Sequence, residues 1–245
     1  MESPQSCRKG SKAPSLPNMS EHVANFGRRS YPALVFDLDG TLIDSLRDIS
    51  EAANASLVEQ GFPDHALESY RRFVGDGVRV LFERALPADR RDPELITRCA
   101  AGFATHYALG WNRHTQLYAG IAGLLDELSR RRVRLAVLSN KPHPFTCQCV
   151  RHFLSAWNFE VVAGQKEGIP KKPDPAGAVA VANELGVNPG QLALVGDSSV
   201  DMETARNAGL DAIGVSWGFR SREELWQHGA QVVIDDPRQL LDLLP

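Results

Sequence analysis

Short, mainly apolar runs recur along the chain, once near Ala33 and five times in its second half. Each run spans four to six residues, which suits a strand that is covered on both faces of a parallel sheet. We therefore expect six strands, at Ala33–Phe36, Val133–Leu138, Phe159–Val162, Gln191–Val195, Ala212–Val215 and Gln231–Ile234.

Amphipathic segments separate most of these runs and predict helices. They read "GLLDELSRR" before the second strand, and "DPAGAVAVANELG", "VDMETARNAG", "SREELWQHG" and "DPRQLLDLL" further on. The first of the later segments ends at Gly186 and the next at Gly209, and glycine suits the turn that closes a helix. Alternating strands and helices predict an α/β fold with a doubly wound, mainly parallel, Rossmann-like sheet.

The interval between the first and second strands breaks this alternation. Residues 45–118 read as helical, and about seventy residues are too many for a simple crossover between parallel strands. Leu46, Ile49, Ala53 and Leu57 form one apolar face closed by Gly61, and more helices are expected near Leu67–Phe73, Val78–Leu86 and Pro93–Leu109. We expect an all-helical domain, residues 45–118, inserted after the first strand of an α/β core that comprises residues 31–44 and 119–245.

Residues 1–30 show no hydrophobic period, so we expect them to form a disordered tail. Translation could begin at Met1 or at Met19, and the sequence leaves both starts open. The tail carries five Lys/Arg and two Glu, whereas the whole chain has a net charge of −3. This balance gives no case for binding nucleic acid or an acidic membrane.

Composition also bears on where the protein acts. There is no run of eighteen apolar residues that predicts a membrane-spanning helix, and the polar start lacks the apolar stretch of a secretory signal. Four cysteines show no disulfide framework, so we expect a cytoplasmic protein. The "CQC" at 147–149 offers too few ligands for zinc and is interpreted as two ordinary helix cysteines.

Polar residues gather at the ends of four predicted strands. "FDLDGT" places Asp37 and Asp39 at the end of the first strand, and "LSNK" follows the second. "KKPDP" lies in the loop after the third, and "VGDSSVD" ends the fourth. Because ligands of such sheets bind outside the carboxyl ends of the strands, we expect these side chains to form one site. Its oxygen-rich, thiol-free composition suits Mg²⁺.

Each segment also has a structural interpretation. The paired aspartates could serve a turn, and "SSVD" could be a capping box in which Ser198 caps a helix and Asp201 bonds back. Ser139 and Asn140 could cap the next segment, and Lys172 could be a solvated charge. A calcium loop is excluded, because Gly40 is at the fourth position counted from Asp37 rather than at the sixth. The four segments at successive strand ends favour a functional site.

Taken together, "DLDGT", "LSN", "KPDP" and "GDSSVD" resemble the motifs of the haloacid dehalogenase-like phosphohydrolases. The resemblance covers residue 32 to the C-terminus. The helical insert resembles the all-helical cap domain of that family. Its segment "RRFVGDGVRVLFERAL", with "SNKPH" and "WGFRS" elsewhere, is similar to the phosphoglycolate phosphatase branch.

The resemblance implies a role for each core residue. Asp37 would be the nucleophile that forms an aspartyl-phosphate, and Asp39 the acid and base, with Gly40 permitting the turn that brings both to one phosphate. Mg²⁺ would be held by Asp37, Asp197 and the backbone carbonyl of Asp39, with Asp201 beside these ligands. The remaining implied contacts to phosphate or substrate come from Gly40, Thr41, Ser139, the backbone amide of Asn140, and Lys172. Lys171 is a rival to Lys172, but the spacing to "PDP" favours Lys172.

Within the insert, "VGDGVR" is the candidate for reading the substrate. The amides around Gly75 and Gly77 could approach a small anion, and the Arg79 guanidinium could bind a carboxylate. The alternative interpretation is a turn between helices with a solvated arginine.

We therefore expect a Mg²⁺-dependent phosphatase that acts on a small phosphorylated metabolite, with 2-phosphoglycolate as the favoured substrate. A phosphomutase, another small-phosphate phosphatase of the same fold and a non-catalytic binding protein are the alternatives. An intact set of charged residues argues against the last. We expect a monomer or a homodimer.

Overall fold

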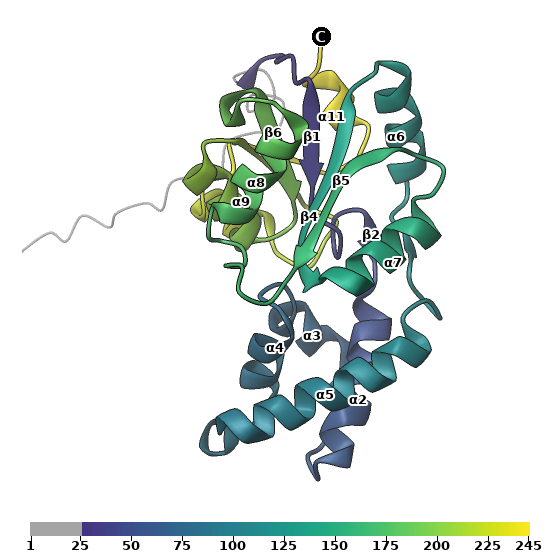
Figure 1. Cartoon of the computed structure of the whole chain (residues 1–245), viewed down its shortest axis with the longest axis vertical. Coiled ribbons are helices and arrows are strands. Elements are labelled where there is room, and N and C mark those ends of the chain that lie inside the picture. The colour runs from purple at the N-terminus through teal and green to yellow at the C-terminus, as the bar shows by residue number, and fades with distance from the viewer. Residues whose placement is uncertain (1–25) are drawn as a thin grey trace, which may run out of the picture.

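A six-stranded sheet forms the centre of the computed structural model, which describes residues 26–245 (Figure 1). All five pairings between neighbouring strands are parallel, and the strand order is β5-β4-β1-β6-β7-β8. The strands are β1 (Ala33–Phe36), β4 (Arg134–Pro142), β5 (Phe159–Gln165), β6 (Leu192–Gly196), β7 (Asp211–Val215) and β8 (Val232–Ile234). The predicted fold class and all six predicted strands are confirmed.

Helices cover both faces of this sheet because side chains on successive strand residues point to opposite sides. In β1, Leu34 and Phe36 enter one apolar cluster, whereas Ala33 and Val35 enter another. The helices α6 (Ile121–Arg130), α7 (His143–Phe153) and α11 (Gln239–Asp242) supply the first cluster. The helices α8 (Ala176–Leu185), α9 (Ser199–Ala208) and α10 (Arg222–Gln227) supply the second.

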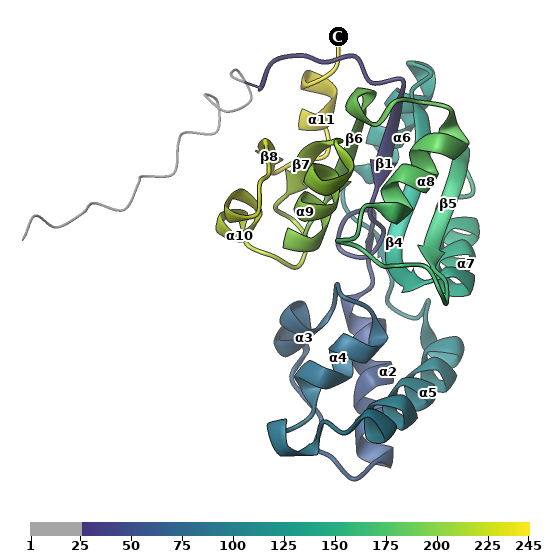
Figure 2. The ribbon, with the colours of Figure 1, turned by 60° about the vertical axis from the view of Figure 1, so that its left-hand side comes forward.

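The helical insert is also confirmed, and it lies beyond one end of the sheet (Figure 2). It contains α2 (Leu46–Glu59), α3 (Leu67–Phe73), α4 (Val78–Ala85), a short 3₁₀ helix (Ala88–Arg90) and α5 (Pro93–Gly110). The helices α2 and α5 approach closely where Gly102 faces Ser56, since a Cβ at Gly102 would lie 2.6 Å from Ser56 Oγ. The Ser56 hydroxyl donates to the Cys99 carbonyl at 2.7 Å, which joins the two helices.

A small two-stranded sheet joins the two chain segments that connect the insert to the main sheet. It consists of β2 (Ile43–Asp44) and β3 (Gln116–Leu117), which pair antiparallel. The sequence analysis missed it, because strands of two residues are too short to show a period. This small sheet brings the start and the end of the insert together, so that its two chain connections to the core lie side by side.

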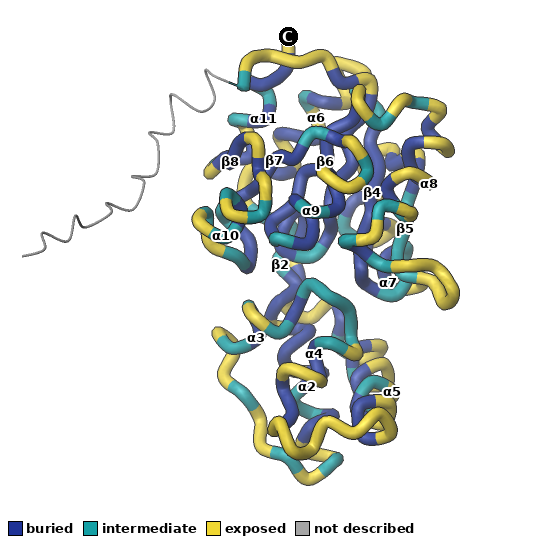
Figure 3. The backbone as a smooth tube through the Cα atoms, turned by 90° about the vertical axis from the view of Figure 1, so that its left-hand side faces the viewer, coloured by how far each residue is buried: buried dark blue, intermediate teal, exposed yellow. Residues whose placement is uncertain are grey.

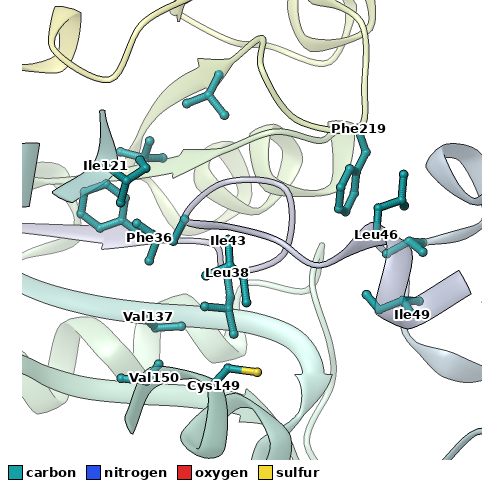
Figure 4. Packing of buried hydrophobic residues seen from close by; sticks show 14 of the residues in the cluster. Phe36, Leu38, Ile43, Leu46, Ile49, Ile121, Val137, Cys149, Val150 and Phe219 are labelled. Carbon is teal, nitrogen blue, oxygen red and sulfur yellow. The ribbon is translucent and has the colours of Figure 1, made fainter. Parts of the chain in front are cut away.

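One apolar cluster continues from the sheet into the insert. Figure 3 shows buried segments in the sheet and, past β2, in the insert. In Figure 4, Leu38 and Ile43 lie between the sheet residue Phe36 and the α2 residues Leu46 and Ile49. This continuity fixes the insert against the sheet through packing as well as through its two connections.

Most of the predicted tail lies outside the described residues, and the boundaries proposed for the three regions stay predictions. Residues 26–30 are described, and two of them contact the core. Phe26 packs against the larger apolar cluster, and Arg29 forms an ion pair with Asp211 at 2.7 Å. Within residues 26–245 no helix is long and apolar enough to cross a membrane.

Asp48 is expected to be a major determinant of stability, because it ties α2 to the segment before β3. This carboxylate is only 2% exposed and accepts from the amides of His114 and Thr115 and from the Thr115 hydroxyl, the last at 2.6 Å. Asp48→Ala leaves these buried donors without an acceptor. We expect the free energy of unfolding to fall by about 3 kcal/mol or more, measured by urea denaturation.

Glu51→Ala is the matched control, since Glu51 lies one turn further along α2 and is 45% exposed. Its ion pairs with Arg47 and with His114 join side chains that are all at least 36% exposed, so the expected loss is below about 0.5 kcal/mol. Equal losses in the two variants would show that Asp48 does not tie the insert together.

Candidate active site

The site lies where the carboxyl ends of β1, β4 and β6 meet the insert. Because β1 lies between β4 and β6, residues that end these strands become neighbours although they are far apart in sequence. Asp37 directly follows β1, and its amide donates to the Val195 carbonyl of β6 at 2.9 Å. Asp197 directly follows β6, and Ser139 is part of β4, which extends further than expected.

Lys172 connects the carboxylates of this site. Its ammonium donates to Asp37 Oδ1 at 2.8 Å, to Asp201 Oδ1 at 2.6 Å and to the Leu138 carbonyl at 3.0 Å. The side chain is buried, so these charge-assisted bonds replace its lost hydration. The structure thus brings Lys172, rather than Lys171, to the predicted nucleophile.

The site has more anionic than cationic groups. Burial raises the pKa of Asp37 to about 7, although Lys172 opposes this shift. Burial likewise raises the pKa of Asp197 well above its ordinary value, and Asp201 and Asp37 raise it further. For Lys172, burial lowers the pKa, but Asp201 and Asp37 outweigh burial, so the net shift is upward and the ammonium is retained. Three carboxyl groups face one ammonium, an imbalance that a bound cation would correct.

The donor set fits a hard divalent cation. Oxygen atoms of Asp37, Asp197 and Asp201 lie within 4.8 Å of one another, with no thiol or imidazole in the group. Asp201 is already engaged, because Oδ1 accepts from Lys172 and Oδ2 accepts from the Ser198 amide and hydroxyl. The capping-box interpretation of this segment is therefore also confirmed. Asp37 and Asp197 are left as the carboxylates most able to bind a cation.

Asp197 is held by tight backbone packing. Its Oδ2 accepts from the Phe219 amide at 2.7 Å, and its Oδ1 accepts from the Thr41 hydroxyl at 3.3 Å. Gly40 has a φ of +89°, and a Cβ there would lie 2.3 Å from Asp197 Oδ2. Thr41 therefore contacts Asp197 and is not part of the cavity wall described below.

Asp39 points to a different set of partners. Its Oδ1 accepts from the Ser45 hydroxyl at 2.5 Å, and the Lys141 ammonium lies 2.9 Å from Oδ1 and 3.0 Å from Oδ2. For Lys141, burial lowers the pKa, but Asp39, Tyr107 and Cys149 together raise it by more, so the net shift is upward and the group stays cationic. The paired aspartates thus face two different lysines.

Ser139 and Asn140 lie between the two ion pairs. The Ser139 Oγ accepts from the Lys141 amide at 3.3 Å. The Asn140 side chain accepts from the Lys172 amide at 2.9 Å and donates to the Lys172 carbonyl at 3.0 Å, which fixes the backbone of Lys172. The same amide group donates to the Gly75 carbonyl of the insert at 3.1 Å.

Two more core side chains donate to neighbouring carbonyls of the insert. Arg220 donates to the Val74 carbonyl at 2.7 Å, and Lys171 donates to the Asp76 carbonyl. With Asn140, three core residues thus bind three consecutive carbonyls of the insert. We call these bonds the carbonyl latch, and they hold the insert closed over the site.

A small cavity of about 60 Å³ lies between the insert and the core. The core contributes Asp37, Asp39, Ser139, Asn140, Lys141, Pro142 and Phe145, and the insert contributes Ile49, Val74, Gly75, Gly77, Val78, Leu81, Phe103 and Tyr107. Gly77 caps α4 with a φ of +86°, so the positive end of this helix faces the cavity. The glycine segment of the insert is therefore placed at the site.

The structure does not bring Arg79 to the site. Arg79 is exposed, its guanidinium donates to the Thr97 hydroxyl of α5 at 3.0 Å, and it is not part of the cavity wall. Gly77 and Val78 begin α4 at the cavity, and Arg79, the next residue, points to another face of that helix. The alternative interpretation, a solvated arginine next to a turn, agrees with this placement.

Several residues of the site received no role from the sequence, although "LSNK" already placed Lys141 among the polar residues at the strand ends. Lys141 and Tyr107 line the cavity, and a Cβ at Gly196 or Gly218 would lie 2.3 Å from Asp201 Cγ or Asp197 Cβ, respectively. For Lys141 the signal was its place beside Ser139 at a strand end. For Gly196 it was its place directly before Asp197, whereas Gly218 and Tyr107 gave none, because only folding brings them to the site.

A doubly wound sheet whose first strand ends in buried carboxylates under a helical insert defines a class of enzymes. Haloacid dehalogenase-like hydrolases as a family match residues 34–215, which is most of the chain. The chain belongs to this family.

Several proteins similar to this chain carry the name phosphoglycolate phosphatase. A phosphoglycolate phosphatase of Pseudomonas putida is 36% identical over 215 residues, which is 86% of this chain and 79% of the relative. One of Psychrobacter arcticus is 33% identical over 86% of this chain and 94% of the relative. A crystal structure from Lactobacillus delbrueckii subsp. bulgaricus, of a protein assigned as a phosphoglycolate phosphatase, is 32% identical with a TM-score of 0.83 and covers 88% of this chain and 99% of that one.

Gly218→Ala tests the packing behind Asp197. The new methyl group would also lie 2.4 Å from the Gly40 carbonyl, so the backbone of both segments must shift. We expect the free energy of unfolding to fall by about 1–3 kcal/mol and cation binding, measured by calorimetry, to weaken with it.

Gly123→Ala is the control, because a Cβ at this α6 position meets nothing within 4 Å. It should raise stability by about 0.5–1 kcal/mol, as expected for alanine within a helix, and leave cation binding unchanged. If Gly218→Ala behaved in the same way, Asp197 would not depend on this close approach.

Proposed function

We propose that the protein is a Mg²⁺-dependent phosphomonoester hydrolase that uses Asp37 as nucleophile and acts on 2-phosphoglycolate. One observation carries the proposal. Among the described residues, Asp37 alone belongs both to the buried carboxylate group suited to a cation and to the cavity wall. Its carboxylate is therefore placed to meet a substrate and a cation at once.

The chain's own residues account for the nucleophile and for the proton transfers of two displacement steps. Asp37 attacks phosphorus, the bond from phosphorus to the ester oxygen breaks, and Asp39 gives its proton to that oxygen. Asp39 then takes a proton from a water molecule, whose oxygen attacks phosphorus and releases phosphate from Asp37. Lys172 orients Asp37 and balances its charge, and Ser139 and the backbone amide of Asn140 bind phosphoryl oxygens.

A cation has a defined place in this scheme. Asp37, Asp197 and the backbone carbonyl of Asp39 would hold Mg²⁺, with Asp201 fixing Lys172 beside them. When bound, Mg²⁺ screens the negative charge of the phosphate so that a carboxylate can approach it.

The relatives and the cavity support the choice of substrate. Relatives named phosphoglycolate phosphatase align over most of their own length. The cavity of about 60 Å³ between the insert and the core, with an apolar wall from the insert, supports a small ester as the substrate. The oligomeric state stays a prediction.

A panel of phosphate esters, assayed with and without Mg²⁺, tests the proposal. Release of phosphate from 2-phosphoglycolate that requires Mg²⁺ is the expected result. Transfer of the phosphoryl group to a sugar hydroxyl would instead identify a phosphomutase, and neither activity would leave a non-catalytic binding protein.

Asp37→Asn should lower kcat for 2-phosphoglycolate at least about a thousandfold, because an amide cannot form the phosphorylated intermediate. The change is nearly isosteric and removes a carboxylate that burial disfavours, so the melting temperature should not fall. Asp211→Asn is the control at the opposite end of β7, where Asp211 pairs with Arg29, and its kcat should stay normal. Turnover by Asp37→Asn near the wild-type rate would exclude Asp37 as nucleophile.

Asp39→Asn should slow alkyl phosphates more than aryl phosphates. An alkoxide leaving group needs a proton, whereas an activated aryl oxide leaves with less help. The measurement is the rate of phosphoryl-enzyme formation for both ester types by rapid quench. The same loss for both would argue that Asp39 is not the acid.

A further inference from the structure

Lys141 is a buried cation to which the proposed mechanism gives no task. Its side chain is 5% exposed and it lines the cavity beside Asp39 and Ser139. Burying an ammonium is costly unless bonds replace its hydration, and the hydrogen bonds of the Lys141 ammonium go to the two carboxylate oxygens of Asp39. An ammonium has three N–H donors, so at least one remains for a ligand.

Lys141 is also the one cation among the described residues that form the cavity wall. The other cations near the site have different partners or directions. Lys172 binds Asp37 and Asp201 behind the wall, Lys171 binds the Asp76 carbonyl, and Arg79 binds Thr97 on the outside. A second anionic group of a substrate in this cavity therefore meets Lys141.

Tyr107 of the insert completes the surroundings of this ammonium. Its ring centroid lies 4.6 Å from Lys141 Nζ, a cation–π contact, and the ring is fixed by stacking on Phe103 and by the edge of Phe145. The Tyr107 hydroxyl is buried without a hydrogen-bond partner among the described residues. A buried donor without a partner is rare in proteins, and a ligand oxygen would satisfy it.

We propose that Lys141 recognises a carboxylate of the substrate and so selects phosphate esters of 2-hydroxy acids. This inference rests on the proposed function and extends it. Asp39 would protonate the ester oxygen, and in such esters the carboxylate is attached to the carbon that bears this oxygen. Since the Lys141 ammonium lies within 3.0 Å of both Asp39 oxygens, the substrate carboxylate reaches it without stretching.

The substrate class follows from this geometry. A small ester with its carboxylate next to the ester carbon matches Asp39 and Lys141 together, whereas a sugar phosphate presents only hydroxyl groups to the ammonium. The insert then contributes shape, through Tyr107 and its apolar neighbours, while the core supplies the charge that reads the substrate. This assigns to Lys141 the role that the sequence analysis gave to Arg79.

A matched pair of unreactive analogues tests the proposal by calorimetry with Mg²⁺ present. In 3-phosphonopropionate a methylene replaces the ester oxygen of phosphoglycolate, and propylphosphonate carries a methyl group in place of the carboxylate. We expect wild-type protein to bind 3-phosphonopropionate roughly tenfold to a hundredfold more tightly, the range for a hydrogen bond to a charged group. Equal affinities in wild type would overturn the proposal without any variant.

Variants locate the effect. Lys141→Gln keeps a donor for Asp39 but loses the charge, and the affinity ratio should fall close to one, whereas Lys141→Arg should retain most of it. Lys166→Met is the control, an exposed lysine outside both the cavity wall and the carbonyl latch, and should keep the wild-type ratio. A wild-type ratio in folded Lys141→Gln would show that Lys141 only positions Asp39. If Lys141→Gln does not fold, the wild-type ratio and that of Lys141→Arg decide.

Turnover separates this inference from the proposed function. If 2-phosphoglycolate is hydrolysed but Lys141→Gln keeps the wild-type ratio, the function stands and the role of Lys141 fails. If wild type prefers the carboxylate analogue yet does not hydrolyse 2-phosphoglycolate, Lys141 reads a carboxylate and the substrate is another 2-hydroxy acid ester.

Discussion

The ammonium of Lys172, shared between Asp37 and Asp201, is the interaction on which the site depends. Three carboxyl groups are buried together at the carboxyl ends of the strands, at a cost in free energy: burial, and then repulsion between the carboxylates, raises the pKa values of Asp37 and Asp197. Lys172 offsets part of it and leaves room for one further cation. Its backbone is fixed by Asn140, so the position of the central charge is set by a side chain of the neighbouring strand.

The arrangement of the strands explains why so few residues make the site. With β1 between β4 and β6, three neighbouring strands bring Asp37, Ser139 and Asp197 together at their carboxyl ends. The small sheet of β2 and β3 then holds the insert over these strand ends. The division of labour is clear: the core carries nearly all the charge, and the insert carries apolar and aromatic surface with backbone groups.

Sequence reasoning succeeded where the fold depends on pattern. Apolar runs gave the six strands, and the order of motifs at their ends indicated which polar residues would meet. Sequence reasoning failed where the direction of a side chain or a tertiary contact determines which residues reach the site. Nothing in "GDGVR" states which face of α4 carries Arg79, and nothing in "LSNK" shows that Lys141 would contact Asp39 and Tyr107. The two-residue strands β2 and β3 are too short to show a period of apolar and polar residues.

The carbonyl latch has a consequence for how such an enzyme changes over time. Asn140, Lys171 and Arg220 bind the backbone of Val74, Gly75 and Asp76, not their side chains. Every residue type offers the same carbonyl, so these bonds do not depend on the side chains of Val74 and Asp76, whereas Gly75, with a φ of +120° and Arg220 beside it, must stay glycine. New specificities can therefore be explored at Val74 and Asp76, by evolution or by design, without re-engineering the way the lid shuts.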